Sequence, residues 1–283
     1  MKKSSLSGIK NVIWALAIFA ALTALLVGFA FSVSTRYNGE KESGVLTLGQ
    51  GRKADSISDD GVIFSSGADN ALNTGVLREM VSTQDNGLSA AFSYTYLCDS
   101  SIMGINEYSM DFGSSATAEM WTDDGSGFPA ANAANASIIF PSDGSLLTPA
   151  DAAMVYQPKR LVIYIGGDEL AAADEASFIS GYTQLINSIR SVSSDTAIIC
   201  CSIASVSSAY PSSDGLTASL VAQANDWIRQ VCSNTGVYYA DLASLLNDEN
   251  GFLRDEYSSP NGRSLGSAGI AEVIQYFRYH GVG

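Results

Sequence analysis

The sequence is poor in histidine. Its 283 residues include only one, His280, and the chain has no Cys-x-x-Cys pair. Zinc sites in proteins are built mainly from closely spaced histidine and cysteine ligands, so we expect no metal centre and no bound cofactor. We expect His280 to be a surface residue near the C-terminal end of a helix, where a positive charge is favourable. A hydrolase that uses histidine as its base would depend on this one residue.

Basic residues are also scarce. The chain has 15 lysines and arginines against 29 acidic residues, which gives a formal net charge of −14. Nucleic acids and anionic membrane surfaces are bound by clustered lysine and arginine, so the composition argues against both partners. We interpret the acidity as a feature that favours solubility.

The chain has only four cysteines, and it is long enough to bury a core without crosslinks. Cys200 and Cys201 are adjacent on a predicted strand, so their side chains point to opposite faces. Cys232, on the following predicted helix, could form a disulfide with one of them. The alternative is that these cysteines act as small apolar residues in the core.

One apolar segment is long enough to cross a bilayer. The stretch 12–33 contains no charged residue and exceeds the roughly 20 residues that a spanning helix needs. Lys2, Lys3 and Lys10 precede it, whereas all 29 acidic residues follow it, so the part after the segment carries a formal charge of about −17. This distribution predicts a cytoplasmic N-terminus and an extracytoplasmic C-terminal part. A cleavable signal peptide is the alternative, but Ala30-Phe31-Ser32 matches the usual cleavage pattern poorly.

These observations predict a single-pass protein of the cell membrane. We divide the chain into a cytoplasmic N-terminus, a transmembrane signal anchor, a polar linker and one ectodomain, at residues 1–11, 12–33, 34–59 and 60–283.

Short apolar runs alternate with amphipathic segments in the ectodomain. Leu161 to Ile165 is a continuous apolar run, typical of a strand buried on both faces. A helix is indicated by apolar residues at three- and four-residue spacing: Phe178, Tyr182, Leu185, Ile186 and Ile189. Further strands are predicted at 62–64, 90–98, 196–203 and 237–240, further helices at about 70–81, 220–231 and 268–279, and a long surface excursion at 111–136. Pro149 opens a short predicted helix, with Thr148 available as its N-cap. The alternation predicts an α/β fold whose parallel sheet is covered by helices on both faces.

Several of these segments resemble the SGNH (GDSL-type) hydrolases, a family of esterases, lipases and acyltransferases. Val62 to Ala68 resembles the block in which an apolar strand runs into Gly-Asp-Ser. Leu161 to Leu170 is similar to the block that ends in Gly-x-Asn-Asp, and Glu256 to Leu265 to the block that ends in Asp-Gly-x-His-Leu. The resemblance covers most of 61–280 and implies a flavodoxin-like three-layer α/β sandwich.

The family's catalytic positions carry other residues here. The resemblance places Ala68 at the nucleophilic serine, Asn261 at the catalytic aspartate and Ser264 at the catalytic histidine. Asp168 takes the place of the oxyanion-binding asparagine, where a carboxylate would repel the developing charge, and Gly104 corresponds to the glycine of the second block. The resemblance therefore implies a domain without an intact catalytic set.

Two substitutes for the lost groups remain open. Ser66 could act as nucleophile with Asp168 or Glu169 as base, although a carboxylate with its ordinary pKa of about 4 is a weak base. Asp168 and Glu169 could also form a carboxylate pair, but adjacent side chains diverge. Asp248 to Gly251 lacks the ligand spacing of a calcium loop, so we interpret it as a turn.

Three functions follow from this pattern. The first is a catalytically degenerate domain that binds an envelope glycan or a membrane-protein partner at the cell surface. The second is an active esterase or acyltransferase on cell-envelope glycans with a non-standard site. The third is a structural or sensory ectodomain without a small-molecule site.

Overall fold

The computed structural model describes residues 75–107 and 117–282, which belong to one unit spanning Ser65–Gly283. The predicted anchor 12–33, the linker 34–59 and the strand 62–64 lie outside the described residues. Within the described part of the chain, no helix is both long enough and apolar enough to cross a membrane.

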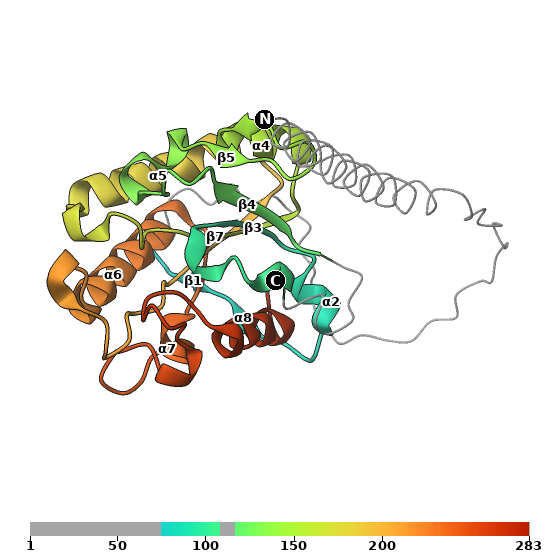
Figure 1. The fold of residues 1–283 in the computed structure, drawn as a ribbon. Helices are drawn as coiled ribbons and strands as arrows, with labels where there is room; N and C mark the ends of the chain where they lie inside the picture. Colours follow the sequence, from blue (N-terminus) through green and yellow to red (C-terminus); the bar gives the residue numbers. More distant parts are fainter. Residues whose placement is uncertain (1–74, 108–116, 283) are drawn as a thin grey trace, which may run out of the picture. The chain divides into compact units, whose positions relative to one another are not determined.

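A mostly parallel sheet of eight strands forms the centre of this unit, in the order β1-β9-β8-β7-β3-β4-β5-β6 (Figure 1). Along this order, the neighbouring pairs β1–β9, β9–β8, β8–β7, β7–β3 and β3–β4 are parallel. The pairs β4–β5 and β5–β6 are antiparallel. The strands are β1 (Arg78–Glu79), β3 (Thr95–Cys98), β4 (Glu119–Asp123), β5 (Ile138–Ile139), β6 (Leu146–Leu147), β7 (Arg160–Tyr164), β8 (Ala197–Cys201) and β9 (Tyr238–Ala240). A separate antiparallel pair joins β2 (Val81–Ser82) to β10 (His280–Gly281).

The central strands confirm the apolar runs read from the sequence. β7 lies between β3 and β8, with Ile163 in register with Leu97 on one side and Cys200 on the other. All three side chains are fully buried. Both faces of these strands are covered, which explains why their sequences show no alternation of apolar and polar residues.

Helices cover the two faces of the sheet (Figure 1). α4, α5 and α6 lie on one side, and α2, α7 and α8 lie on the other. Phe178 of α5 packs on Trp227 of α6. Phe277 of α8 packs against Tyr96 of β3 and against Tyr94, which precedes that strand. The helices are α2 (Leu88–Ala91), α4 (Pro149–Tyr156), α5 (Glu175–Val192), α6 (Ala218–Thr235), α7 (Ala243–Leu246) and α8 (Ser267–Tyr279), with short 3-10 turns at η1 (Ser100–Ile102), η2 (Ala130–Asn135), η3 (Leu170–Ala172), η4 (Ser212–Asp214) and η5 (Asp255–Tyr257).

Local sequence signals set the ends of the long helices. Thr148 caps α4 by accepting a hydrogen bond from the backbone N–H of Asp151, as predicted, and Thr217 caps α6 in the same way through Leu220. Gly236 ends α6 with a φ of 68°, a left-handed conformation that favours glycine. The predicted α/β class with a mostly parallel sheet is confirmed.

The helix predicted at about 70–81 is wrong over its described part. Arg78–Glu79 forms β1, parallel to β9, and Val81–Ser82 pairs with β10. Met80 lies between them, and its N–H donates to the carbonyl of Tyr239. The backbone groups of this segment find partners far along the chain, and those contacts override its local helical pattern.

The surface excursion predicted at 111–136 is also partly wrong. Its residues 119–123 form β4, which pairs in parallel with β3, and Trp121 on this strand is fully buried. The predicted strand 90–98 is shorter than expected, because Leu88–Ala91 is helical and only Thr95–Cys98 is extended.

Cysteine serves as a core residue in the described chain. Cys98, Cys200, Cys201 and Cys232 are buried free thiols. Of the two possibilities, a disulfide from Cys232 to β8 is not formed, and the interpretation of these cysteines as small apolar core residues is confirmed. Burial raises the pKa of the Cys200 and Cys201 thiols well above the ordinary value, which keeps them protonated.

Candidate functional site

A pocket of about 160 Å³ opens at the carboxyl ends of β3, β7 and β8. Parallel sheets gather their functional loops at this edge, so the pocket lies where a site is expected. Its polar lining comes from three loops, after β3, after β7 and before α8: Asp99, Ser101, Gly167, Asp168, Asn261, Arg263 and Ser264. Among the described residues that line it there is no histidine.

Asp99 directly follows β3 and is only 2% exposed. It caps η1, because its Oδ1 accepts hydrogen bonds from both the backbone N–H (3.0 Å) and the hydroxyl of Ser101. Burial raises the pKa of this carboxyl from 3.8 to about 6, the Ser101 hydroxyl opposes the rise, and the nearby Asp168 carboxylate adds to it. The pocket therefore contains a carboxyl group that titrates close to neutral pH.

Asp168 and Arg263 form an ion pair across the pocket. Arg263 Nη2 donates to Asp168 Oδ1 at 2.9 Å and to the carbonyl of Gly167 at 2.9 Å. The other carboxylate oxygen of Asp168 accepts the N–H of Phe128 at 2.9 Å. Both oxygens of Asp168 are thus engaged, and its charge is balanced by the guanidinium.

Asn261 and Ser264 stand side by side in the loop that precedes α8. Asn261 Nδ2 donates to Ser264 Oγ at 3.1 Å, and Asn261 Oδ1 accepts the N–H groups of Arg263 and Ser264. Gly262 between them has a φ of 72°, and a Cβ there would lie 2.8 Å from Ser207 Oγ, so this tight turn requires glycine. The turn holds both side chains at the pocket.

The structure brings together three of the residues singled out from the sequence: Asp168, Asn261 and Ser264. Gly104 lies against Ile270 of α8 and does not line the pocket. Glu169 is exposed at a positive φ and also stays outside the lining. Ser66 and Ala68 lie outside the described residues.

His280 takes no part in the pocket. It directly follows α8, where its Nδ1 lies 2.9 Å from the carbonyl oxygen of Tyr276 and its ring stacks on the ring of that tyrosine. Its backbone pairs with Ser82. The prediction that His280 lies at the C-terminal end of a helix is confirmed.

Three polar side chains of the pocket loops were not predicted: Asp99, Ser101 and Arg263. A signal for the first was present, because Asp99-Ser100 directly follows the buried strand β3 and matches the last two residues of Gly-Asp-Ser. Cysteine in place of glycine, and the resemblance read at 62–68, hid this match. No comparable signal identifies Arg263, because its partners Gly167 and Asp168 lie far away in the sequence.

This geometry defines the class of protein, which is an α/β domain with a polar pocket at the carboxyl edge of a mostly parallel sheet. The family model of the GDSL-like lipase/acylhydrolase family matches residues 112–262, just over half of the chain. The chain therefore belongs to this family. The matched range contains Asp168 and Asn261 and excludes Cys98-Asp99-Ser100 and Ser264.

Solved structures with a similar fold include three in which the match covers most of the other chain. The first is a protein of Slackia heliotrinireducens assigned to the SGNH hydrolases, with 12% identity and a TM-score of 0.48 over 65% of this chain and 96% of that chain. The second is a GDSL-like lipase from Bacteroides thetaiotaomicron, with 12% identity and a TM-score of 0.43 over 66% of this chain and 87% of that chain. The third is the periplasmic domain of a lipopolysaccharide acetyltransferase from Salmonella ser. Paratyphi A, with 14% identity and a TM-score of 0.44 over 65% of this chain and 81% of that chain. No curated protein shows significant similarity to the sequence.

The buried carboxyl of Asp99 predicts a pH-dependent stability. Below pH 3.8 this group is neutral in both the folded and the unfolded chain, and between pH 3.8 and about 6 only the folded chain keeps the proton. The free energy of unfolding should therefore fall as the pH rises through this window, by on the order of 3 kcal/mol. Asp99→Asn stays neutral and keeps the Oδ1 acceptor, so it should be more stable than the wild type at about pH 7 and similar to it at about pH 4.

Urea unfolding of both proteins at the two pH values measures this difference. If wild type and Asp99→Asn lose equal stability between about pH 4 and about pH 7, titration of Asp99 is not the cause of the loss.

Proposed function

We propose that this protein is a membrane-anchored, extracytoplasmic member of the GDSL family that binds a ligand at the cell surface without hydrolysing it. The observation that carries the proposal is the hydrogen bond from Asn261 to Ser264 at the pocket. By the family resemblance, these two positions belong to the catalytic aspartate and histidine. An amide and a hydroxyl can occupy the same geometry, but neither accepts a proton near neutral pH.

Three other candidate groups do not replace the imidazole: Asp168, Glu169 and His280. Asp168 is paired with Arg263 and accepts the N–H of Phe128, so both of its oxygens already have a hydrogen-bond partner. Glu169 lies outside the pocket lining. The ring nitrogen of His280 contacts the carbonyl oxygen of Tyr276 at the end of α8. The pocket itself is open and polar, which favours ligand binding over a purely structural or sensory domain.

The location in the membrane rests on the sequence. The uncharged stretch 12–33, preceded by three lysines and followed by an acidic chain, supports an anchor with the domain on the extracytoplasmic side. We infer that the ligand belongs to the cell envelope, either a glycan or another membrane protein.

One contact favours an active enzyme as the second candidate. The Ser101 hydroxyl donates to Asp99, whose pKa of about 6 makes it a stronger base than an ordinary carboxylate. The same oxygen of Asp99 also accepts the N–H of Ser101, which is the geometry of a helix cap and explains the contact without catalysis. We therefore rank this esterase or acyltransferase below the binding function.

Labelling with a fluorophosphonate tests the proposal, because this reagent reacts with serines whose hydroxyl is activated by a base. The full-length protein in mild detergent should show an unchanged intact mass after incubation, under conditions that fully modify a known serine esterase. An adduct mapped to Ser100 or Ser101 would instead establish an activated nucleophile.

A further inference from the structure

A second, larger hollow lies next to the pocket. It is a groove of about 990 Å³ formed by the loop after β8, the first half of α6, the end of β9 and the turn before Leu253. Val206 and Leu216 line both the groove and the pocket, so the two hollows are neighbours that share part of their wall. A chain-like ligand lying in the groove would therefore pass beside the pocket.

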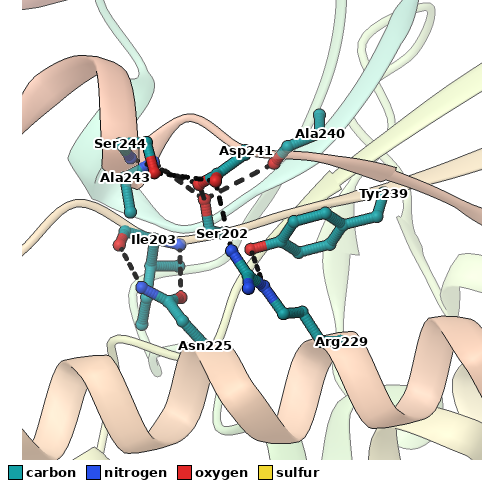
Figure 2. A network of polar contacts seen from close by, with 9 residues as sticks. All are labelled: Ser202, Ile203, Asn225, Arg229, Tyr239, Ala240, Asp241, Ala243 and Ser244. Carbon is teal, nitrogen blue, oxygen red and sulfur yellow. Dashed lines mark hydrogen bonds and ion pairs between the residues drawn. The ribbon is translucent and has the colours of Figure 1, made fainter. Parts of the chain in front are cut away.

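The floor of the groove is held in place by a network of hydrogen bonds (Figure 2). Asp241 accepts from Ser202 Oγ at 3.2 Å, from Arg229 Nη2 at 3.1 Å and from Ser244 Oγ at 2.7 Å. Arg229 Nε also donates to the hydroxyl of Tyr239. Asn225, one turn earlier on α6, fixes the loop after β8 by bonding both backbone groups of Ile203, at 2.8 and 2.9 Å. A floor fixed in this way loses little freedom when a ligand binds.

The charge of the groove limits the class of ligand. Asp226, Asp241, Asp248 and Glu249 line it, against the single cation Arg229, which is already paired with Asp241. An anionic chain would meet repulsion here, because like charges across an interface cost binding energy. Phosphate-rich or uronate-rich polymers are therefore disfavoured.

The remaining lining is suited to a hydroxyl-rich ligand. Serine, threonine and asparagine side chains supply donors and acceptors along the groove, and Tyr210 and Phe252 line it as half-buried aromatic rings. The Asp248 carboxylate is oriented by the N–H groups of Asn250 and Phe252. Sugar rings match such a surface, because they present hydroxyls at their edges and apolar C–H groups on their faces.

We propose that this groove binds a neutral glycan chain, with a substituent of one sugar seated in the pocket. The inference rests on the proposed function and specifies its ligand class as uncharged and hydroxyl-rich. The groove supplies the binding surface, and the pocket supplies the selectivity for the substituent.

Isothermal titration calorimetry on the full-length protein in mild detergent tests this proposal. The probes are N-acetylchitohexaose, cellohexaose and mannohexaose as neutral chains, and hexagalacturonate as an anionic chain of equal length. At least one neutral probe should bind, and hexagalacturonate should bind more weakly by roughly tenfold or more. Ala222→Trp changes an exposed position of α6 that lines the groove, and it should weaken binding of the neutral probe by roughly tenfold or more.

Ala176→Trp is the matched control, because Ala176 is an exposed alanine of α5 that lines neither hollow. Binding by none of the neutral probes, tighter binding of hexagalacturonate, or equal weakening by both tryptophan variants would overturn the proposal. These outcomes do not depend on fluorophosphonate labelling. Failure of the glycan site is therefore distinguishable from failure of the proposed function.

Discussion

Replacing Asn261 with aspartate and Ser264 with histidine in one chain is expected to create esterase activity. Hydrolysis of p-nitrophenyl acetate should rise roughly 10²- to 10⁴-fold above the wild-type rate, the usual contribution of a positioned general base. The two side chains already lie 3.1 Å apart at the pocket, so an imidazole at 264 would have an orienting carboxylate beside it. Initial rates at about pH 8, above the ordinary pKa of histidine, measure the gain.

The gain should depend on the serine that follows Asp99. Adding Ser100→Ala to the double variant is expected to return the rate to the wild-type level, whereas Ser208→Ala, at an exposed serine outside the pocket, should leave the gain intact. Adding Asp168→Asn should raise the rate further, because it removes a carboxylate near the developing oxyanion. If the double variant melts like the wild type and stays inactive even with Asp168→Asn, the assignment of positions 261 and 264 to the catalytic dyad is wrong.

Gly181→Ala is expected to lower the free energy of unfolding by about 3 kcal/mol, near the upper end of the usual cost of overpacking a core. Gly181 lies in α5, where an added Cβ would be 2.4 Å from the carbonyl oxygens of both Ala130 and Ala131. Those atoms belong to the backbone of η2, so they cannot move aside like a flexible side chain. The better helix propensity of alanine, worth about 1 kcal/mol, opposes this cost without cancelling it.

Urea unfolding of the full-length protein measures the effect, with Ser180→Ala as the matched control. Ser180 is the preceding residue of the same helix and is exposed, so this alanine should change stability by less than about 0.5 kcal/mol. If Gly181→Ala is as stable as Ser180→Ala, helix α5 does not pack against η2 at the distance described.

The sequence alone predicts the elements whose signal is local. The apolar run at β7 and the three- and four-residue spacing along α5 mark buried faces, and the side chains at those positions are buried. Thr148 and Pro149 mark the start of α4 for the same reason, since a cap acts within one helical turn.

Elements that depend on distant partners are harder to predict. β4 lies in a segment rich in glycine, alanine, serine and asparagine, and it becomes a strand because β3 offers it a ladder of hydrogen bonds. β1 is extended because it pairs with β9, which lies far along the chain. Neither pairing leaves a pattern within the segment itself.

The candidate site shows the same division. Asp168, Asn261 and Ser264 were found because they stand at recognisable positions of the family's blocks, and they converge on one pocket. Arg263 was missed because its role is an ion pair to a different loop. Asp99 was missed although Asp99-Ser100 matches part of the family's first block, because cysteine stands in place of its glycine and the block was read at 62–68.

The central claim is that the pocket binds without hydrolysing, because no imidazole is among the described residues that line it. Hydrolysis of p-nitrophenyl acetate and of an acetylated neutral glycan by the wild-type, full-length protein measures it most directly. The predicted rates equal those of a protein carrying both Ser100→Ala and Ser101→Ala. A saturable wild-type rate that this double variant abolishes would contradict the claim and identify a working esterase.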